Sequence, residues 1–146
     1  MKKQVKTFYN IEKDKKEPYT KVVKREKISV REIHDLEVTN TYWRDPDGEL
    51  WLNPDNPMEN SKNGFSVYRQ RKGYLQPEEI RAVREKTGIS LNKFAELIGI
   101  GKSSLSQIEN NLRVQSKEQD SLFKLIKAEV ARTGKLESLT CHHVSS

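Results

Sequence analysis

The sequence predicts an α+β protein, with a small N-terminal β-rich domain followed by an all-α domain. Residues 20–27 and 29–43 are rich in β-branched and aromatic side chains with partial polar–apolar alternation, which is typical of strands. Further along the chain, apolar residues recur at helical spacing between capping residues and glycines. Because 34% of the 146 residues are hydrophobic and 33% are charged, two small cores fit the composition better than one thick core.

The β-rich domain is expected to span residues 1–56. The apolar side chains of its sheet would come from Val30, Ile33, Val38, Tyr42 and Trp43. The run Asp-Pro-Asp-Gly at 45–48 is a strong turn signal, because each of these residue types favours a turn conformation. Residues 49–52 then predict a short return strand. The strands and the turn together indicate a small antiparallel sheet.

A change of composition follows the sheet. Residues 53–64 are rich in Asn, Pro and Gly, which indicates a linker or hinge. We place the linker region at 57–74. A helix within it is expected to begin near Pro57 or Phe65 and to end by Gly73.

Two short helices separated by a glycine turn are predicted inside the all-α domain, which is expected to cover residues 75–134. Ser90 is a good N-cap for the first helix, residues 91–98, because its hydroxyl can accept from free backbone amides. The apolar stripe of this helix consists of Phe94, Ala95 and Ile98. Gly99 can adopt the left-handed conformation that ends a helix, and a second helix follows at roughly 102–110.

The second helix has an apolar side and a polar side. Leu105 and Ile108 form the apolar side, which is expected to face the core. The polar side consists of Ser103, Ser106, Gln107 and Asn110. Such short, uncharged side chains can approach base edges in the major groove, as the second helix of a helix-turn-helix does, so we predict that these four read bases. The predicted phosphate contacts are Lys102, Arg113, Lys93, Arg81 and Ser90.

A longer helix is predicted after this motif. Ser116 and Gln119 form a capping box that opens a helix over residues 117–132. Its apolar stripe consists of Leu122, Leu125, Ile126 and Val130. Phe123 lies at one edge of the stripe. The stripe is expected either to pack only against the core or also to join two protomers through its surplus apolar surface, and we favour a homodimer. A two-fold dimer matches a palindromic operator in double-stranded DNA whose half-sites lie roughly 34 Å apart.

The motif residues resemble those of a known family. Ala-Glu-x-x-Gly followed by Ser-x-x-Glu-Asn is carried by Ala95, Glu96, Gly99, Ser106, Glu109 and Asn110. This pattern is similar to the Cro/repressor-type (XRE) helix-turn-helix family, and the resemblance implies that Ser103 and Gln107 read bases. Leu91 stands where many relatives carry a Gln that touches the DNA backbone. Asn111 replaces the usual glycine after the recognition helix, and Asn tolerates the left-handed region.

A second resemblance covers about residues 75–130. The stretch Pro-Glu-x-Ile-x-x-Val-Arg, which consists of Pro77, Glu78, Ile80, Val83 and Arg84 in this chain, is similar to the start of the DNA-binding domain of MqsA-like antitoxins. In that family the N-terminal half is a zinc domain that is built on two Cys-x-x-Cys pairs and binds a toxin.

This chain has no cysteine at the corresponding places. Near them stand Asn10, Lys13, Arg44 and Asp47, which cannot rebuild a tetrahedral thiolate site. The resemblance therefore implies a metal-free, cysteine-less remnant of a zinc-ribbon-like fold. We expect this remnant to be held by Tyr9, Tyr42, Trp43 and Trp51.

Charge is separated along the N-terminal half. Residues 1–31 carry eleven basic and four acidic residues, whereas residues 32–59 carry eight acidic residues and one arginine. These blocks either attract one another within the domain, face solvent, or bind a charged partner. The predicted partner-binding residues are Glu32, Asp35, Glu37, Asp45, Asp47 and Glu49. The net charge of the whole chain, +6, favours a polyanionic partner.

Several classes of protein are disfavoured. No apolar run reaches the roughly 18 residues of a membrane span, and the N-terminus lacks the apolar core of a secretory signal. With one cysteine, Cys141, no internal disulfide forms, so we predict a cytoplasmic protein. Cys141, His142 and His143 are expected to lie in a flexible tail, 135–146, rather than in a metal site. We predict no catalytic site and no cofactor.

Two functions remain open. The first is an antitoxin of a type II toxin–antitoxin pair, which represses its own operon and neutralises a toxin through its N-terminal half. The second is a phage-encoded repressor, or an inhibitor that binds a host protein or nucleoprotein and uses the helix-turn-helix for autoregulation or dimerisation.

Overall fold

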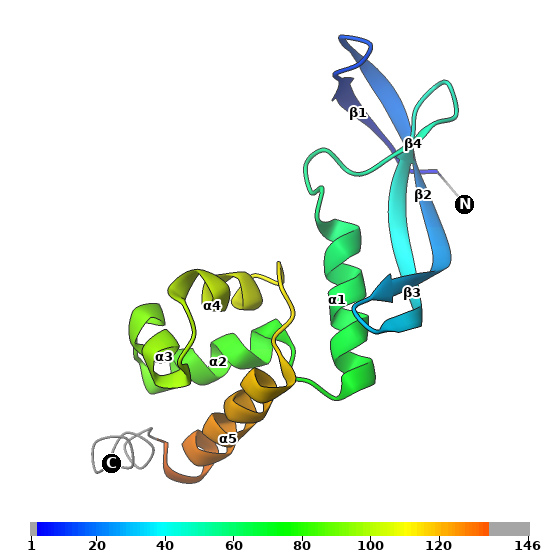
Figure 1. Ribbon diagram of the computed structural model, residues 1–146. Coiled ribbons are helices and arrows are strands. Elements are labelled where there is room, and N and C mark those ends of the chain that lie inside the picture. The colour runs from blue at the N-terminus through cyan, green and yellow to red at the C-terminus, as the bar shows by residue number, and fades with distance from the viewer. Residues whose placement is uncertain (1–2, 135–146) are drawn as a thin grey trace. The chain divides into compact units, whose positions relative to one another are not determined.

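The structure is a computed structural model that describes residues 3–134 (Figure 1). It divides into two compact units, Met1–Val67 and Tyr68–Ser146, which we name the sheet unit and the helical unit. The division falls inside helix α1, Glu59–Lys72. The tail predicted at residues 135–146, with Cys141 and its two neighbouring histidines, lies outside the described residues.

The sheet unit contains a four-stranded antiparallel sheet with the strand order β1-β2-β3-β4, so the predicted α+β class is confirmed. The strands are β1 (Val5–Asn10), β2 (Lys15–Val30), β3 (Ile33–Arg44) and β4 (Leu50–Trp51). The sequence predicted strands at 20–43 and 49–52, and it missed β1 and the beginning of β2. Strands β2 and β3 form a long hairpin, and its tight turn places Arg31 in the left-handed region with a φ of 50°.

One face of the sheet is covered by the first part of α1. Asn60 binds β3 through both of its amide atoms: Oδ1 accepts from the Thr41 N–H and Nδ2 donates to the Thr41 carbonyl, each at 2.9 Å. Gly64 allows α1 to approach the sheet closely, since a Cβ at this position would lie 2.7 Å from Ile28 Cδ1. The composition of residues 53–64 predicted a linker or hinge. The last part of this segment, residues 59–64, is instead helical and packs on the sheet.

The opposite face holds a small aromatic core. The rings of Phe8 and Tyr19 meet edge to face with centroids 5.4 Å apart, and those of Phe8 and Trp43 with centroids 5.2 Å apart. Trp51 packs against this cluster. Our expectation that Tyr9 and Tyr42 share this role was wrong. Alternate strand residues point to opposite faces, so Tyr9 is 51% exposed and Phe8 takes the core position.

A lysine joins the two turns at this end of the sheet. The ammonium of Lys13 lies 3.2 Å from Glu17 Oε2 and 3.7 Å from Asp45 Oδ2, and it also pairs with Asp47. Asn10 Oδ1 caps the first turn by accepting from the Lys13 N–H. Asn10, Lys13 and Asp47, three of the four residues expected near the absent cysteines, therefore lie together in this cluster. The fourth residue, Arg44, is exposed.

The environment shifts the pKa values of the lysine and of the buried carboxylate. The hydrogen bond to Asp47 raises the pKa of Lys13 above its ordinary value. Burial raises the pKa of Asp45, but hydrogen bonds from Trp51 Nε1 and the Glu49 N–H outweigh it and hold this pKa below its ordinary value. Both shifts favour the charged forms, so the lysine-centred cluster is ionic near neutral pH.

Acid is expected to weaken the sheet unit through this cluster. Since the folded pKa of Asp45 is lowered, its carboxylate stabilises the fold above the ordinary value of 3.8, and the stabilisation is lost as pH falls through the folded pKa. We expect Asp45→Asn to flatten the fall of stability between about pH 5 and pH 2. Trp43 and Trp51, the two tryptophans of the chain, allow urea unfolding of this unit to be followed by fluorescence. An unchanged profile, equal to that of the exposed control Asp55→Asn, would contradict the expectation.

The helical unit contains α2 (Pro77–Thr87), α3 (Leu91–Ile98), α4 (Lys102–Glu109) and α5 (Lys117–Thr133). The predicted caps are confirmed: Ser90 Oγ accepts from the Lys93 N–H, Gly99 is left-handed with a φ of 79°, and Ser116 and Gln119 form a capping box. The core includes Ile80, Phe94, Leu105, Ile108, Phe123 and Ile126. No helix within residues 3–134 is long and apolar enough to cross a bilayer.

A buried arginine holds the loop that follows α4. Arg69, near the end of α1, is 0% exposed. Its Nε donates to Gln115 Oε1 at 2.9 Å, its Nη2 donates to the Arg113 carbonyl at 2.7 Å, and its Nη1 donates to Asn111 Oδ1. Asn111 is left-handed with a φ of 59°, as expected for a residue that stands in place of glycine. One side chain thus fixes three residues of the loop.

Candidate nucleic-acid interface

Helices α3 and α4 are joined by a three-residue turn. Gly99 N–H donates to the Ala95 carbonyl at 2.9 Å, and Ile100 N–H donates to the same carbonyl at 3.1 Å, so the chain leaves α3 in a tight bend. Gly101 is the N-cap of α4 and has an extended backbone. The turn brings two eight-residue helices together, and both contribute buried side chains to the core.

Helix α4 separates a buried side from an exposed side, as predicted. Leu105 and Ile108 are each 0% exposed and anchor the helix in the core. Ser103 and Gln107 are exposed and lie one helical turn apart. Anchoring on one side keeps this exposed pair at a fixed position on the surface, which is what contact with base edges requires.

Ser106 and Asn110, the other two predicted base-reading residues, contact other residues of the same chain. Ser106 is half-buried. Asn110 Nδ2 donates to the Ser106 carbonyl at 2.9 Å, while Asn110 Oδ1 accepts from Arg81 Nη2 at 2.9 Å. Contact of Asn110 with a base would therefore compete with these bonds.

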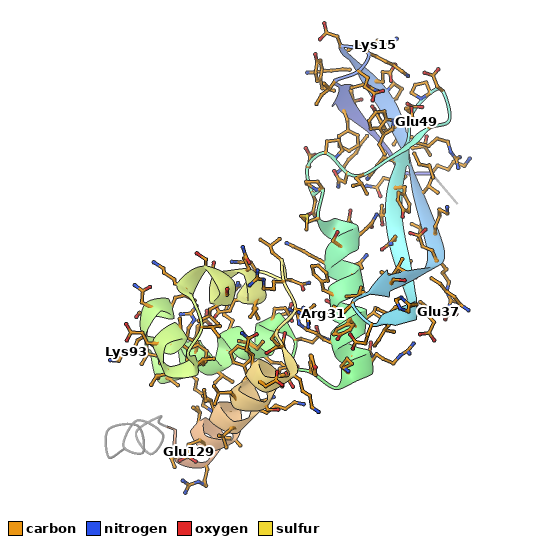
Figure 2. The ribbon with its side chains drawn as sticks, viewed as in Figure 1. Lys15, Arg31, Glu37, Glu49, Lys93 and Glu129 are labelled. Atoms are coloured by element: carbon orange, nitrogen blue, oxygen red, sulfur yellow. The ribbon has the colours of Figure 1, made fainter. Side chains whose placement is uncertain are left out.

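The helix-turn-helix also carries the cationic residues that were predicted to contact phosphates. Lys102 is exposed at the first turn of α4, where Gly101 provides no side-chain cap for the backbone amides. Lys93 is exposed on α3 (Figure 2). Arg113 is exposed and donates to Ser104 Oγ at 3.0 Å. Arg81 is half-buried and donates to the Glu109 carbonyl at 2.8 Å, so it also supports α4 from within.

The sequence did not predict the ion pair that fixes the end of α4. The side chain of Glu109 is 3% exposed, and its two oxygens accept from Arg84 Nε and Nη2 at 2.8 and 2.9 Å. This bond raises the pKa of Arg84 above its ordinary value. The pair joins α4 to α2. The sequence motif contains Glu109, but it does not indicate which residue binds its carboxylate.

The predicted partner-binding carboxylates do not form one patch. Asp45 is buried and Asp47 pairs with Lys13, both at the end of the sheet that carries the aromatic core. Glu37 lies 3.4 Å from Arg25 on the long hairpin, and Figure 2 shows Glu37 and Glu49 toward different ends of the sheet. The remaining two, Glu32 and Asp35, are exposed near the hairpin turn.

A family model described as helix-turn-helix matches residues 80–128. These residues form an XRE-type helix-turn-helix domain. A domain of this type implies DNA as the binding partner and is typical of non-enzymatic transcriptional regulators. The match includes α3, the glycine turn and α4. No match to the chain was found among curated proteins or among solved structures.

Proposed function

We propose that the chain is a transcriptional regulator that recognises a specific DNA sequence with α4 and represses its own operon. The exposed pair Ser103 and Gln107 carries this proposal, because it presents uncharged hydrogen-bonding groups on a helix whose other side is fully buried. The exposed residues Lys102, Lys93 and Arg113 supply the charge that phosphate contacts need. The test is binding to the chain's own upstream DNA and to scrambled DNA over a salt series.

Gln107→Ala is expected to lower the affinity for the preferred DNA by about 1–3 kcal/mol and to relax the choice of base at one position. The physical reason is that glutamine can make two hydrogen bonds to adenine, whereas alanine makes none. Fluorescence anisotropy with a set of singly substituted duplexes measures both effects. An equal loss of affinity for every duplex would contradict base reading.

Lys102→Ala provides the matched control on the same helix. A phosphate contact carries no sequence information, so this variant should bind all duplexes more weakly and by a similar factor. The slope of log affinity against log salt should also become shallower by about one unit. The two variants together separate base reading from general attraction to DNA.

The proposed active form is a homodimer on a palindromic operator. Leu125 is 54% exposed on α5, and Val83 and Val130 line an apolar hollow of about 260 Å³ between α2 and α5. These surfaces support association through α5. Light scattering at working concentration should give a mass of two chains, and a mass of one chain would contradict the dimer.

We further propose that the regulator is the antitoxin of a type II pair and that its sheet unit binds the toxin. The exposed carboxylates Glu32, Asp35 and Glu37, which lie close together in the β2–β3 hairpin, support contact with a basic surface such as that of an RNA-cleaving toxin. Co-expression of the full chain with the product of the neighbouring gene tests this step. Relief of growth arrest and co-purification are expected. Repression without either result would leave a plain repressor.

A further inference from the structure

The β2–β3 hairpin has one face covered by α1 and one face open to solvent. Ile28 pairs with the buried Leu36, and its side chain lies against Gly64 of α1, so this pair marks the covered face. Alternate residues of a strand point to opposite faces. The odd-numbered residues of β2 from 21 to 27 therefore point to the open face, and all of them are exposed: Lys21, Val23, Arg25 and Lys27.

The open face is rich in cationic side chains. Lys6 of β1 belongs to it, because its ammonium lies 5.8 Å from the centroid of the Trp43 ring, and Trp43 pairs with Lys21. Residues 21–27 and 37–43 place one carboxylate on this face, that of Glu37, which lies 3.4 Å from Arg25. We name four side chains the basic face, and together with Glu37 they carry a net charge of +3: Lys6, Lys21, Arg25 and Lys27.

The side chains of the open face suit phosphate groups better than a protein partner. Lysine is depleted at the cores of protein–protein interfaces, which are apolar and rich in aromatic residues. Within residues 21–27 and 37–43, Val23 is the one large apolar side chain that is exposed. Phosphate oxygens accept from Lys, Arg and Thr side chains, and the exposed Thr39 stands directly across from Arg25. An extended polyanion therefore complements this face in charge and in hydrogen bonding.

We propose that the basic face is a second DNA contact, which binds the phosphate backbone of double-stranded DNA and reads no bases. The proposal rests on DNA as the ligand of the helix-turn-helix domain, and it is independent of the antitoxin role. Because both contacts belong to one chain, binding at one raises the effective concentration of DNA at the other. The basic face then adds affinity and salt dependence, while Ser103 and Gln107 retain the choice of bases.

The test compares two double variants of the full chain that remove the same charge from the same strand. Lys21→Gln/Lys27→Gln removes two lysines of the basic face. The control Lys16→Gln/Lys24→Gln removes two exposed lysines from the other face of β2, where Lys24 pairs with the buried Asn40. Fluorescence anisotropy measures binding to two duplexes of equal length, the chain's own upstream DNA and a scrambled sequence. Urea unfolding followed by tryptophan emission should give the same midpoint for both variants.

The basic-face variant should bind both duplexes at least about fivefold more weakly and by a similar factor, because it loses contacts to phosphates. Its slope of log affinity against log salt should become shallower by about two units, since each phosphate contact contributes about 0.9. The control should stay within about twofold of the parent, because exposed charges are screened beyond about 8 Å at physiological salt. Glu37→Gln removes the carboxylate beside Arg25 and should bind both duplexes about twofold more tightly.

Acetylation of lysines, read by mass spectrometry, locates the contact in the parent chain without any substitution. Bound DNA should slow the acetylation of Lys21 and Lys27 and leave that of Lys16 and Lys24 unchanged. These four lysines lie on one strand and are all exposed, so they differ chiefly in the face to which they point.

Three outcomes would overturn the proposal. Unchanged DNA affinity of the basic-face variant would show that this face does not touch DNA. Equal losses for the two double variants would show only a general attraction of charge. A basic-face variant that binds DNA as the parent does, but loses affinity for a single-stranded RNA of the same length, would make RNA the ligand. Failure of the proposed regulator looks different: the parent would not prefer its own upstream DNA, while the basic-face losses would still appear on both duplexes.

Discussion

Arg69→Ala is expected to lower the free energy of unfolding of the helical unit by several kcal/mol, because each hydrogen bond from a charged group that is lost contributes about 1.5–3 kcal/mol. The guanidinium is 0% exposed, and it donates to Gln115, Asn111 and the Arg113 carbonyl. Alanine removes all three donors and leaves the buried Gln115 Oε1 without the hydrogen bond from Arg69. The loop between α4 and α5 would lose its support. Urea unfolding followed by helical circular dichroism measures the change.

Two comparisons make this result specific. Arg69→Lys keeps the charge but cannot reproduce the planar set of donors, so it should fall between the parent and alanine. Gln70→Ala alters the exposed neighbour on the same helix and should stay within about 0.5 kcal/mol of the parent. A loss below about 1 kcal/mol for Arg69→Ala would mean that the loop holds without this arginine.

Glu109→Ala is the second substitution with a large expected effect, a loss of about 3 kcal/mol in the helical unit. The carboxylate is 3% exposed and binds Arg84 through both oxygens. Its removal leaves the Arg84 guanidinium, whose side chain is 19% exposed, without its counter-charge. It also leaves the hydrogen bonds of Arg81 to the Glu109 carbonyl and to Asn110 as the polar contacts between α2 and the end of α4 within the described residues. Thermal and urea unfolding should both show the loss.

The matched control is the other glutamate of the motif. Glu96 is exposed on α3, so Glu96→Ala should change stability by no more than about 0.5 kcal/mol. At a temperature where the Glu109→Ala variant remains folded, this variant should bind all DNA duplexes more weakly and by a similar factor, because it retains Ser103 and Gln107. If Glu109→Ala altered the preferred base at one position, it would contradict a purely supporting role.

The helix-turn-helix could be predicted from the sequence because its signals are local. Ser90, Gly99 and Ser116 act through backbone groups within a few residues, and the structure confirms each of them. The sides of α4 followed from helical periodicity alone, with Leu105 and Ile108 buried. Such features need no knowledge of what packs against the helix.

The sheet unit was harder to predict because the burial of a strand residue depends on which distant strand pairs with it. Phe8 and Tyr9 are adjacent aromatic residues, and which of them is buried depends on the register of β1 against β2. Strand β1 itself is short and half polar, so its pattern alone did not identify it. Pairing with β2 determines both its existence and its face.

Buried charges were the least predictable part of the candidate site. Arg69 stands in a basic stretch with Arg71 and Lys72, and charged residues are rarely fully buried, so nothing in the sequence indicated its burial. Its acceptors lie more than 40 positions away in the chain. Glu109 likewise meets Arg84 across 25 positions. Only the fold brings these groups together.

A single cation holds the lysine-centred cluster of the sheet unit together. The cation that joins its two turns is Lys13, a part of the polypeptide itself. The link therefore forms as the chain folds, without delivery of an ion, and neither a chelator nor a thiol oxidant acts on it. Acetylation of this amine would remove its charge and disconnect the turns.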